Sequence, residues 1–302
     1  MSKKSYFGVN GVARNVKSWP VGIGNVARKA KSGYFGVGGV ARQFLSGVDP
    51  VLNNNDWATI RAVSDANQGA NYWSVGDTKT ITINGKVGAT TFSNLSIDAY
   101  IIGFNHNSAK EGRNRTHFLI GKSGGKLVGL CDENYKSFRM NSSNTNSGGW
   151  KASQMRKTLL GNSGTPTRPT ANTLLAALPF DLLAVMKSVT KYTDNTANGE
   201  GNNASYVTAT TDYLFLLAEF EVHGSRTYAN SYEKKSQEQY DYFKAGNSKI
   251  AYRHTATGTA VAWWLRSADY SDSWYFCNVD TDGKANGNIA TSSLGVLPGF
   301  AV

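Results

Sequence analysis

Apolar and polar positions alternate in short runs at the start of the chain. The segments YFGVNGVAR (6–14), PVGIGNVAR (20–28) and YFGVGGVAR (34–42) recur every 14 residues, each with a Gly-rich bend between two such runs. Alternation predicts short β-strands, and the glycines predict turns or close backbone approach. A unit this small cannot bury a core alone, so it is expected to stack on neighbouring units or on other chains. Residues 1–48 are interpreted as a stalk or attachment segment, with a flexible basic linker as the alternative.

From residue 49 onward the pattern is that of one α+β domain, residues 49–302. Helical patterns occupy residues 56–69, 150–159, 173–189 (divided by Pro179) and 237–246. Strand patterns occupy residues 72–85, with Asn84-Gly85 as the predicted hairpin turn, and then 99–106 and 213–222. Two long polar loops, MNSSNTNSGG (140–149) and TDNTANGEGNNAS (193–205), separate these elements. Loops of that length inside a compact domain are usually functional or mobile.

Charge is distributed unevenly along the chain. The formal net charge is +11, and residues 1–48 contain eight basic residues and no acidic residue. Such a segment attracts phosphate or another anionic surface regardless of sequence. A soluble attachment segment and a nucleic-acid-binding arm both remain open, although the interleaved glycines favour ordered structure over a disordered tail.

Cysteine and histidine usage gives little sign of metal or redox chemistry. Cys131 and Cys277 are the only cysteines, so there is no disulfide framework; the two could pair, but free buried thiols are expected. No two of the four histidines have the spacing of a metal-binding pair, and each is expected to be structural: His106, His117, His223 and His254. No apolar run approaches the roughly 20 residues of a membrane span, and no secretory signal is visible. The sequence therefore predicts no membrane insertion.

Two acidic motifs contain residues of the types found in catalytic or metal-binding sites. Glu219 and Glu221 lie two residues apart in a predicted strand and would share one face, either for acid–base work or for an ion pair with Arg266. DTDGKANG (280–287) has the D-x-D-G spacing of a calcium loop but lacks the closing Glu. No nucleophile elbow or phosphate-binding loop is present. The sequence predicts a protein that is not an enzyme, with no catalytic residue, metal or cofactor.

The last 40 residues carry the most specific pattern of the chain. The order WWLRS (263–267), FCNV (276–279), DG (282–283) and GVLPGF (295–300) resembles the C-type-lectin-like fold of the formylglycine-generating-enzyme-like superfamily. More narrowly, it resembles variable proteins of diversity-generating retroelements in phages and prophages. The N-terminal repeats resemble those of structural proteins of phages of Gram-positive hosts. The resemblance implies a C-type-lectin-like domain at 49–302 with a variable region at about 268–294.

In that family, a reverse-transcribed copy with changes at template adenines replaces the 3′ end of the gene. Asn codons can then become codons for Asp, Tyr, Ser, Thr, Ile or Leu, but not for Trp or Lys. Trp274 and Lys284 do not fit this origin, and an ordinary polar loop is the alternative. Phe276, Val279, Val296 and Phe300 are expected to face the core. The ligand-binding residues implied are Asp269, Tyr270, Ser271, Asp272, Trp274, Tyr275, Asp280, Asp282, Ile289, Thr291, Ser292 and Leu294.

The resemblance implies a receptor-binding protein of a phage tail tip or fibre, located in the virion and made in the host cytoplasm. Its partners would be a bacterial surface protein or glycan and, through residues 1–48, other virion tail proteins. Small fibre repeats need partners, so an oligomer is expected, with a trimer compatible but not established. Three alternatives remain: a calcium-dependent carbohydrate-binding lectin, a bacterial surface adhesin and a thiol oxidase of the formylglycine-generating type.

Overall fold

The chain forms two units, Met1–Pro50 and Val51–Val302. The structure is a computed structural model. It describes the backbone of six short strands within residues 6–45, and then residues 47–132 and 137–302 in full. Each unit is described by itself below.

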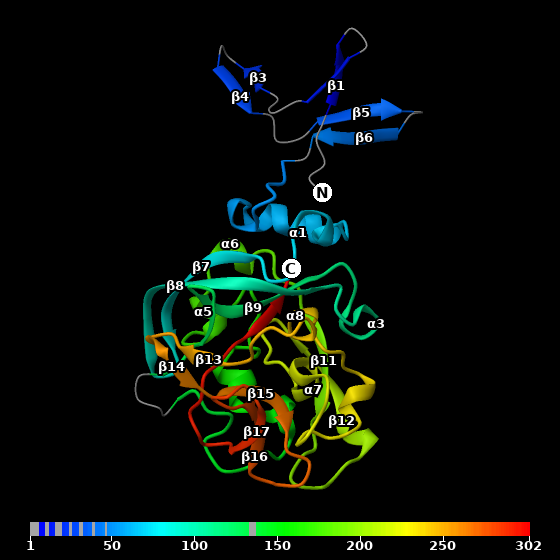
Figure 1. The fold of residues 1–302 in the computed structure, drawn as a ribbon. Coiled ribbons are helices and arrows are strands. Elements are labelled where there is room, and N and C mark those ends of the chain that lie inside the picture. Colours follow the sequence, from blue (N-terminus) through cyan, green and yellow to red (C-terminus); the bar gives the residue numbers. More distant parts are fainter. Residues whose placement is uncertain are drawn as a thin grey trace. The chain divides into compact units, whose positions relative to one another are not determined.

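In the first unit, each repeat folds as one antiparallel hairpin (Figure 1). The pairs are β1 (Tyr6–Val9) with β2 (Val12–Asn15), β3 (Pro20–Ile23) with β4 (Val26–Lys29), and β5 (Gly33–Val37) with β6 (Val40–Leu45). The strand prediction from alternation is confirmed. The predicted turns and the basic side chains that raised the question of nucleic-acid binding lie outside the described residues.

The second unit is built mainly on sheets. A seven-stranded sheet has the order β14-β13-β10-β9-β8-β7, with β18 also paired to β9. All its pairs are antiparallel except β10 with β13. Its strands are β7 (Thr78–Val87), β8 (Thr90–Phe104), β9 (Thr116–Ser123), β10 (Lys126–Gly129), β13 (Ala251–Arg253), β14 (Ala256–Val261) and β18 (Gly299–Ala301).

Two smaller sheets complete the unit. β11 (Val189–Asp194) pairs with β12 (Val207–Asp212), and a three-stranded sheet contains β15 (Trp263–Ala268), β16 (Tyr275–Val279) and β17 (Ala285–Ile289). In Figure 1 the three-stranded sheet lies at the end of the unit opposite to α1 (Trp57–Asp65). This separates the C-terminal hairpin from the region where the second unit begins.

The helices are few and short. Apart from α1, the α-helices of the described residues are α2 (Gly69–Tyr72), α3 (Ser108–Glu111), α4 (Gly149–Ala152), α5 (Leu174–Ala177), α6 (Phe180–Leu183), α7 (Glu219–His223) and α8 (Asp241–Lys244). Short 3-10 turns lie at Leu52–Asn54, Ala204–Tyr206 and Glu233–Lys235. Asp56 caps the N-terminus of α1, because its carboxylate accepts a hydrogen bond from Thr59 N at 2.7 Å. Pro179 separates α5 from α6, as expected from its lack of an N–H. The predicted class, a mixed α and β fold, is confirmed at that level.

Aromatic side chains pack the first helix of the second unit, α1, against its last strand, β18, in one core. The ring of Trp57 packs edge-on against Phe118 and Phe300, with centroids 5.4 and 5.7 Å away. β18 runs beside β9, so the end of the chain is an interior strand and Phe300 is fully buried. The expectation that Phe276, Val279, Val296 and Phe300 face the core is confirmed.

The predicted hairpin turn at Asn84-Gly85 is wrong. β7 continues through both residues, and the turn to β8 lies at Gly88-Ala89. Gly85 has a φ of +136°, and the register shifts between Ile83 and Gly85, so the Asn-Gly pair forms a bulge within the strand. A glycine tolerates this backbone conformation, and a bulge uses it as readily as a turn does.

The predicted strand at 213–222 is also wrong. β12 ends at Asp212, Leu214–Ala218 form a buried segment with one isolated bridge from Phe215 to Gly299, and α7 begins at Glu219. The Glu221 carboxylate accepts a hydrogen bond from Ala218 N at 3.0 Å, which stabilises the first turn of this helix. Because two residues in a helix are separated by roughly 200° of rotation, Glu219 and Glu221 point in different directions rather than sharing a face.

The predicted helix at 150–159 is divided as well. α4 ends at Ala152, and a π-helical turn, Met155–Leu159, follows after Ser153. The predicted helix at 237–246 is limited to α8. Among the described residues, none of the helices combines the length and the apolar character that crossing a membrane requires.

Candidate ligand-binding face

The predicted ligand-binding residues divide between the two ends of one hairpin. In the β16–β17 pair, Tyr275 lies opposite Ile289 and Val279 lies opposite Ala285. Four residue steps of a strand span roughly 13 Å. The residues before Tyr275 and after Ile289 therefore share one end, and Asp280 and Asp282 form the turn at the other end.

Asp269 does not belong to an exposed surface. Its side chain is 7% exposed, and its carboxylate accepts hydrogen bonds from Ser271 N at 2.8 Å and Ser271 Oγ at 2.9 Å. Its own N–H donates to Tyr275 O at 3.1 Å. Asp269 closes the base of the loop that follows β15, and this corrects its assignment as a contact residue.

The remaining residues of this end are exposed or half-buried. Trp274 is 54% exposed, which makes it one of three large apolar side chains so exposed among the described residues. Ser271 is also exposed, and Tyr270, Asp272 and Tyr275 are half-buried. After β17, the half-buried predicted positions are Ile289, Thr291, Ser292 and Leu294. The arrangement presents aromatic rings between short polar side chains.

The two long polar loops lie beside this end of the hairpin. Gly201 N donates a hydrogen bond to Tyr270 O at 2.8 Å, and Asn141 N donates to Ala290 O at 3.0 Å. The Thr291 hydroxyl donates to Asn144 Oδ1. Residues 142–145, 196–203, 270–275 and 289–294 are called the loop face from here on. The sequence marked the two polar loops as functional or mobile but did not place them beside the C-terminal hairpin.

Asn146 holds the loop face together although it is fully buried. Its side-chain amide donates to the carbonyls of Asp272 at 2.6 Å, Tyr275 at 2.8 Å and Asp269 at 3.3 Å. Its Oδ1 accepts from Asn198 N at 2.8 Å, and its N–H donates to Ser273 O at 2.7 Å. One side chain therefore joins all three loops through main-chain groups. Sequence reasoning missed it because it is one Asn among several in a polar run.

The turn at the opposite end of the hairpin satisfies its own acidic groups. Asp280 Oδ1 accepts hydrogen bonds from Asp282 N at 2.9 Å and Lys284 N at 2.8 Å. The Lys284 ammonium lies 3.9 Å from a carboxylate oxygen of Asp282, and both side chains are exposed. An Asp in this position is a capping residue of a tight turn, so the turn does not need a cation.

A network of buried charges lies in the core of the second unit. Lys191 Nζ donates to Glu111 Oε2 at 2.7 Å, to Glu221 Oε1 at 3.1 Å and to the Tyr240 hydroxyl at 2.8 Å. The Arg266 guanidinium forms two hydrogen bonds with the Glu221 carboxylate at 2.5 and 2.7 Å. The predicted structural pair between Arg266 and a glutamate of residues 219–221 is thus confirmed for Glu221.

The electrostatics of this network follow from burial and from the two cations. Burial opposes ionisation of Glu221, but Arg266 and Lys191 outweigh it and hold the pKa of Glu221 well below its usual value. Burial raises the pKa of Glu111 to about 7, against the opposing effect of Lys191. Burial and the charge of Lys191 lower the pKa of His106 to about 3, so its imidazole is neutral.

Three of these side chains have the chemistry of metal ligands. Ligand-type atoms of His106, Glu111 and Glu221 lie within 4.8 Å of one another. Lys191 bonds to both carboxylates and supplies the cation between them, so we assign no metal to this cluster. The sequence did not reveal the cluster because its residues come from separate elements. The structural role expected for the histidines holds for His117, whose Nδ1 lies 3.0 Å from the Tyr240 hydroxyl.

The two cysteines are free and buried, as predicted. Burial raises the pKa of Cys131 to about 11, and burial together with Glu219 raises the pKa of Cys277 well above its usual value. Cys277 is fully buried, and its sulfur lies 3.8 Å from Glu219 Oε2. Neither thiol has the exposure or the low pKa of a reactive thiolate.

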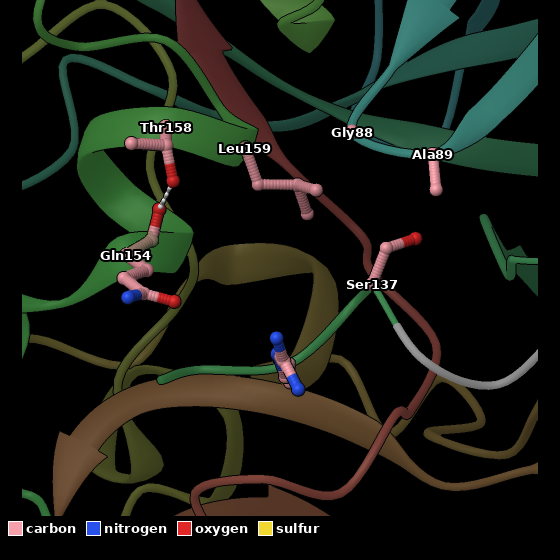
Figure 2. A pocket seen from close by; sticks show the side chains of 7 residues that line it. Gly88, Ala89, Ser137, Gln154, Thr158 and Leu159 are labelled. Atoms are coloured by element: carbon pink, nitrogen blue, oxygen red, sulfur yellow. Dashed lines mark hydrogen bonds between the residues drawn. The ribbon is translucent and has the colours of Figure 1, made fainter. Parts of the chain in front are cut away.

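A pocket of about 300 Å³ is lined in part by the segment that precedes the polar loop 140–149. Figure 2 shows its wall, with Gly88 and Ala89 of the β7–β8 turn on one side and Gln154 and Thr158 on the other. It is lined by Gly88, Ala89, Ser137, Arg139, Gln154, Thr158 and Leu159. Its lining is mostly apolar, and Arg139 forms no hydrogen bond or ion pair with another described residue. It adjoins the loop face, because Leu294 N donates to Phe138 O at 3.2 Å.

Comparison with known proteins identifies the family. Residues 126–302 match a protein family described as a domain of unknown function, DUF6273. The match covers more than half of the chain, so the chain belongs to this family. The matched region includes β10, both polar loops, the C-terminal hairpin and those residues of the charge network that follow residue 126. No match was found among curated proteins or among solved structures.

Proposed function

We propose that Val51–Val302 is a ligand-binding domain with a C-type-lectin-like fold, and that the loop face is its recognition surface. In this proposal the protein is a receptor-binding protein of a phage or prophage tail that attaches to a ligand on a bacterial cell. It acts by binding, without turnover. The observation that carries the proposal is the way in which the loop face is held.

The loop at 269–275 is joined to the neighbouring loops through its main chain, while the Asp269 and Asp272 carboxylates accept hydrogen bonds from Ser271 N and Trp274 N within it. Carbonyls of Asp269, Asp272, Ser273 and Tyr275 accept hydrogen bonds from Asn146, and Tyr270 O accepts from Gly201 N. These bonds do not depend on which side chains the loop carries. A surface held in this way can change its contact residues while its backbone stays in place, as a binding loop on a rigid scaffold requires.

The side chains of the loop face suit recognition of a partner. Aromatic rings such as Trp274 and Tyr270 bring large contact area at a low cost in conformational entropy. The Arg226 guanidinium lies 5.1 Å from the centre of the Tyr270 ring, which stabilises the position of that ring. Ser, Asn and Thr around them supply adaptable hydrogen bonds. This is the composition of antibody binding surfaces.

Residues 1–48 would attach the domain to other tail proteins and bring several copies together. Display of several weak sites on one particle raises the overall affinity for a cell surface without new contacts. A trimer through the hairpin repeats is compatible with this arrangement.

Two alternatives have less support. A calcium-dependent lectin would use Asp280 and Asp282, but Asp280 Oδ1 already accepts two backbone N–H groups. A thiol oxidase would need an accessible, ionisable cysteine, whereas burial raises the pKa of both thiols. Loss of binding on chelation would revive the first, and thiol oxidation that disappears in Cys277→Ser would revive the second.

The binding proposal is tested with the fluorescently labelled full chain on a panel of intact Gram-positive cells and immobilised cell-wall glycans. Trp274→Ala should reduce the binding to the responding cells at least about tenfold, because a central aromatic anchor contributes most to such a contact. The matched control is Phe180→Ala, since Phe180 is 84% exposed on α6 and lies outside the loop face. Equal binding by both variants, or an equal loss in both, would contradict the proposal.

Diversification has its own test in the neighbouring genome. A near-duplicate of the coding sequence for 268–294, differing only at adenines and beside a reverse transcriptase, would establish it. Without such a copy, the loop face would belong to a relative that does not diversify, and the binding experiment would still decide its function.

A further inference from the structure

A second hollow lies away from the loop face, beside the C-terminal end of α1. Its volume is about 440 Å³, and it is lined by Arg61, Asp65, Arg113, Asn114, Arg115, Met186, Lys187, Ser188 and Tyr213. α1 supplies the first two of these residues. The segment before β9, the segment before β11 and the residue after β12 supply the others. In Figure 1, α1 and the β16–β17 hairpin lie at opposite ends of the second unit.

The lining carries an excess of positive charge. It contains three arginines and one lysine against a single carboxylate, that of Asp65. Asp65 is already shared, because its oxygens lie 2.8 Å from Arg61 Nε and 2.6 Å from Lys187 Nζ. One carboxylate cannot neutralise four cations, so the hollow keeps a positive potential that attracts anions.

Main-chain carbonyls hold two of the guanidinium groups in place. Arg61 Nη1 donates to Val185 O at 2.7 Å. Arg115 donates to Ser188 O through Nη2 at 3.0 Å and Nε at 3.3 Å, and to Arg113 O through Nη1 at 2.8 Å. Carbonyl groups orient these cations without removing their charge. A guanidinium that is fixed before a ligand arrives loses less conformational entropy on binding.

The cations also repel one another. The pKa of Lys187 lies below its usual value, first because of burial and also because Arg61 and Arg115 are close. The pKa of Arg115 is lowered by burial and by the charge of Arg61. Arg113 is exposed and forms no side-chain hydrogen bond or ion pair with another described residue. Its guanidinium is available to a ligand at the rim of the hollow.

We propose that this hollow, called the cationic groove, binds a phosphate group. A phosphate carries more than one negative charge and several acceptor oxygens, which match several guanidinium and ammonium donors better than a monocarboxylate does. The Ser188 and Tyr213 hydroxyls can add neutral hydrogen bonds at the same place. The phosphate belongs either to a free monoester or to a phosphodiester of a polymer or lipid headgroup. This site does not depend on the function proposed for the loop face.

The test uses the full chain and isothermal titration calorimetry at constant ionic strength. The probes are inorganic phosphate, pyrophosphate, glycerol 3-phosphate and a glycerol phosphodiester, with sodium chloride as the blank. We expect saturable binding of pyrophosphate or of one ester. Arg113→Gln should weaken it at least about tenfold, because one guanidinium contact is lost. Arg113→Lys should restore part of the affinity, because the charge returns without the planar fork.

The matched control is Lys284→Gln, which removes one exposed positive charge from the hairpin turn at the far end of the unit. This variant should bind as the wild type does. Binding of monoesters alone would assign the groove to a free phosphate compound, and binding of the phosphodiester would assign it to a polymer or headgroup. The proposal is overturned if no probe saturates below about 10 mM, or if Lys284→Gln weakens binding as much as Arg113→Gln.

Discussion

The loop face and the buried charge network use hydrogen bonds in opposite ways. In the loop face, the bonds that join residues 269–275 to the two polar loops end on main-chain carbonyls, and the Asp269 and Asp272 carboxylates add hydrogen bonds within the loop. In the network, Glu221 is bound by the side chains of Lys191 and Arg266. We therefore expect the first region to tolerate changes of side chain better than the second. In the proposed function, this difference separates the recognition surface from the framework that supports it.

The largest loss of unfolding free energy is expected when one charge is removed from the network. Glu221→Gln leaves Arg266 and Lys191 without their shared carboxylate in a buried site. Breaking a buried pair in this way costs about 3–5 kcal/mol of unfolding free energy. Urea denaturation of the wild type and the variant at pH 7 measures the loss. Glu200→Gln, at an exposed position of the polar loop, is the matched control and should change stability little.

A second prediction concerns pH and Glu233. Burial raises the pKa of Glu233 to about 7 from 4.5, although Ser267 and Gln237 donate hydrogen bonds to it. A raised folded-state pKa gives stability that is fully present below pH 4.5 and is lost as the pH rises through about 7. Glu233→Gln cannot ionise, so it should remove this loss, which is about 3 kcal/mol at most. Denaturation midpoints of both proteins between pH 4 and 8 test the sign, and parallel curves would refute it.

The third prediction asks whether Asn146 supports the loop face. Asn146→Ala removes its side-chain bonds to the loop 269–275 and to Asn198 and should cost about 2 kcal/mol of unfolding free energy. Hydrogen exchange should accelerate in residues 269–275 more than in β8. Asn144→Ala, which loses one exposed hydrogen bond to Thr291, is the control. Uniform acceleration across the domain would mean that Asn146 serves the whole fold and not this surface in particular.

The smallest effect is expected at the surface itself. Tyr270→Ser and Trp274→Ala should each change the unfolding free energy by less than about 0.5 kcal/mol, because their side chains accept none of the bonds that hold the loop. Thermal and urea denaturation measure this change. A loss above about 2 kcal/mol in either variant would show that the loop face is part of the framework, and the contrast with the charge network would disappear.

Periodicity and composition predicted much of the local structure. Alternation in the repeats predicted the strands of the three N-terminal hairpins, and the apolar run at 99–104 is part of β8. The turn predicted at Asn84-Gly85 was wrong because the same glycine geometry serves a bulge and a turn. The strand predicted at 213–222 was wrong because the apolar run at its start has no period from which to tell a strand from a buried segment that leads into a helix.

The sequence predicted which segments form the candidate binding face, but not which of their residues meet. The sequence marked both the C-terminal loop and the two polar loops, but it could not show that Asn146 joins them. It grouped Asp280 and Asp282 with Trp274, whereas the hairpin places them at opposite ends. The cationic groove was missed entirely, because Arg61, Arg115 and Lys187 are far apart along the chain.

By itself, the sequence determined the strands of the repeats, many of the apolar residues that are buried, and the polar and aromatic composition of the C-terminal segment. These properties depend on short-range patterns of side chains and backbone preferences. Only the tertiary structure decided which polar groups meet. These pairings join distant segments: Lys191 with Glu111 and Glu221, Asn146 with the loops at 193–205 and 269–275, and Asp65 with Lys187. Hydrogen bonds and charge interactions depend on distances of a few ångströms, and the packing of the sheets sets those distances.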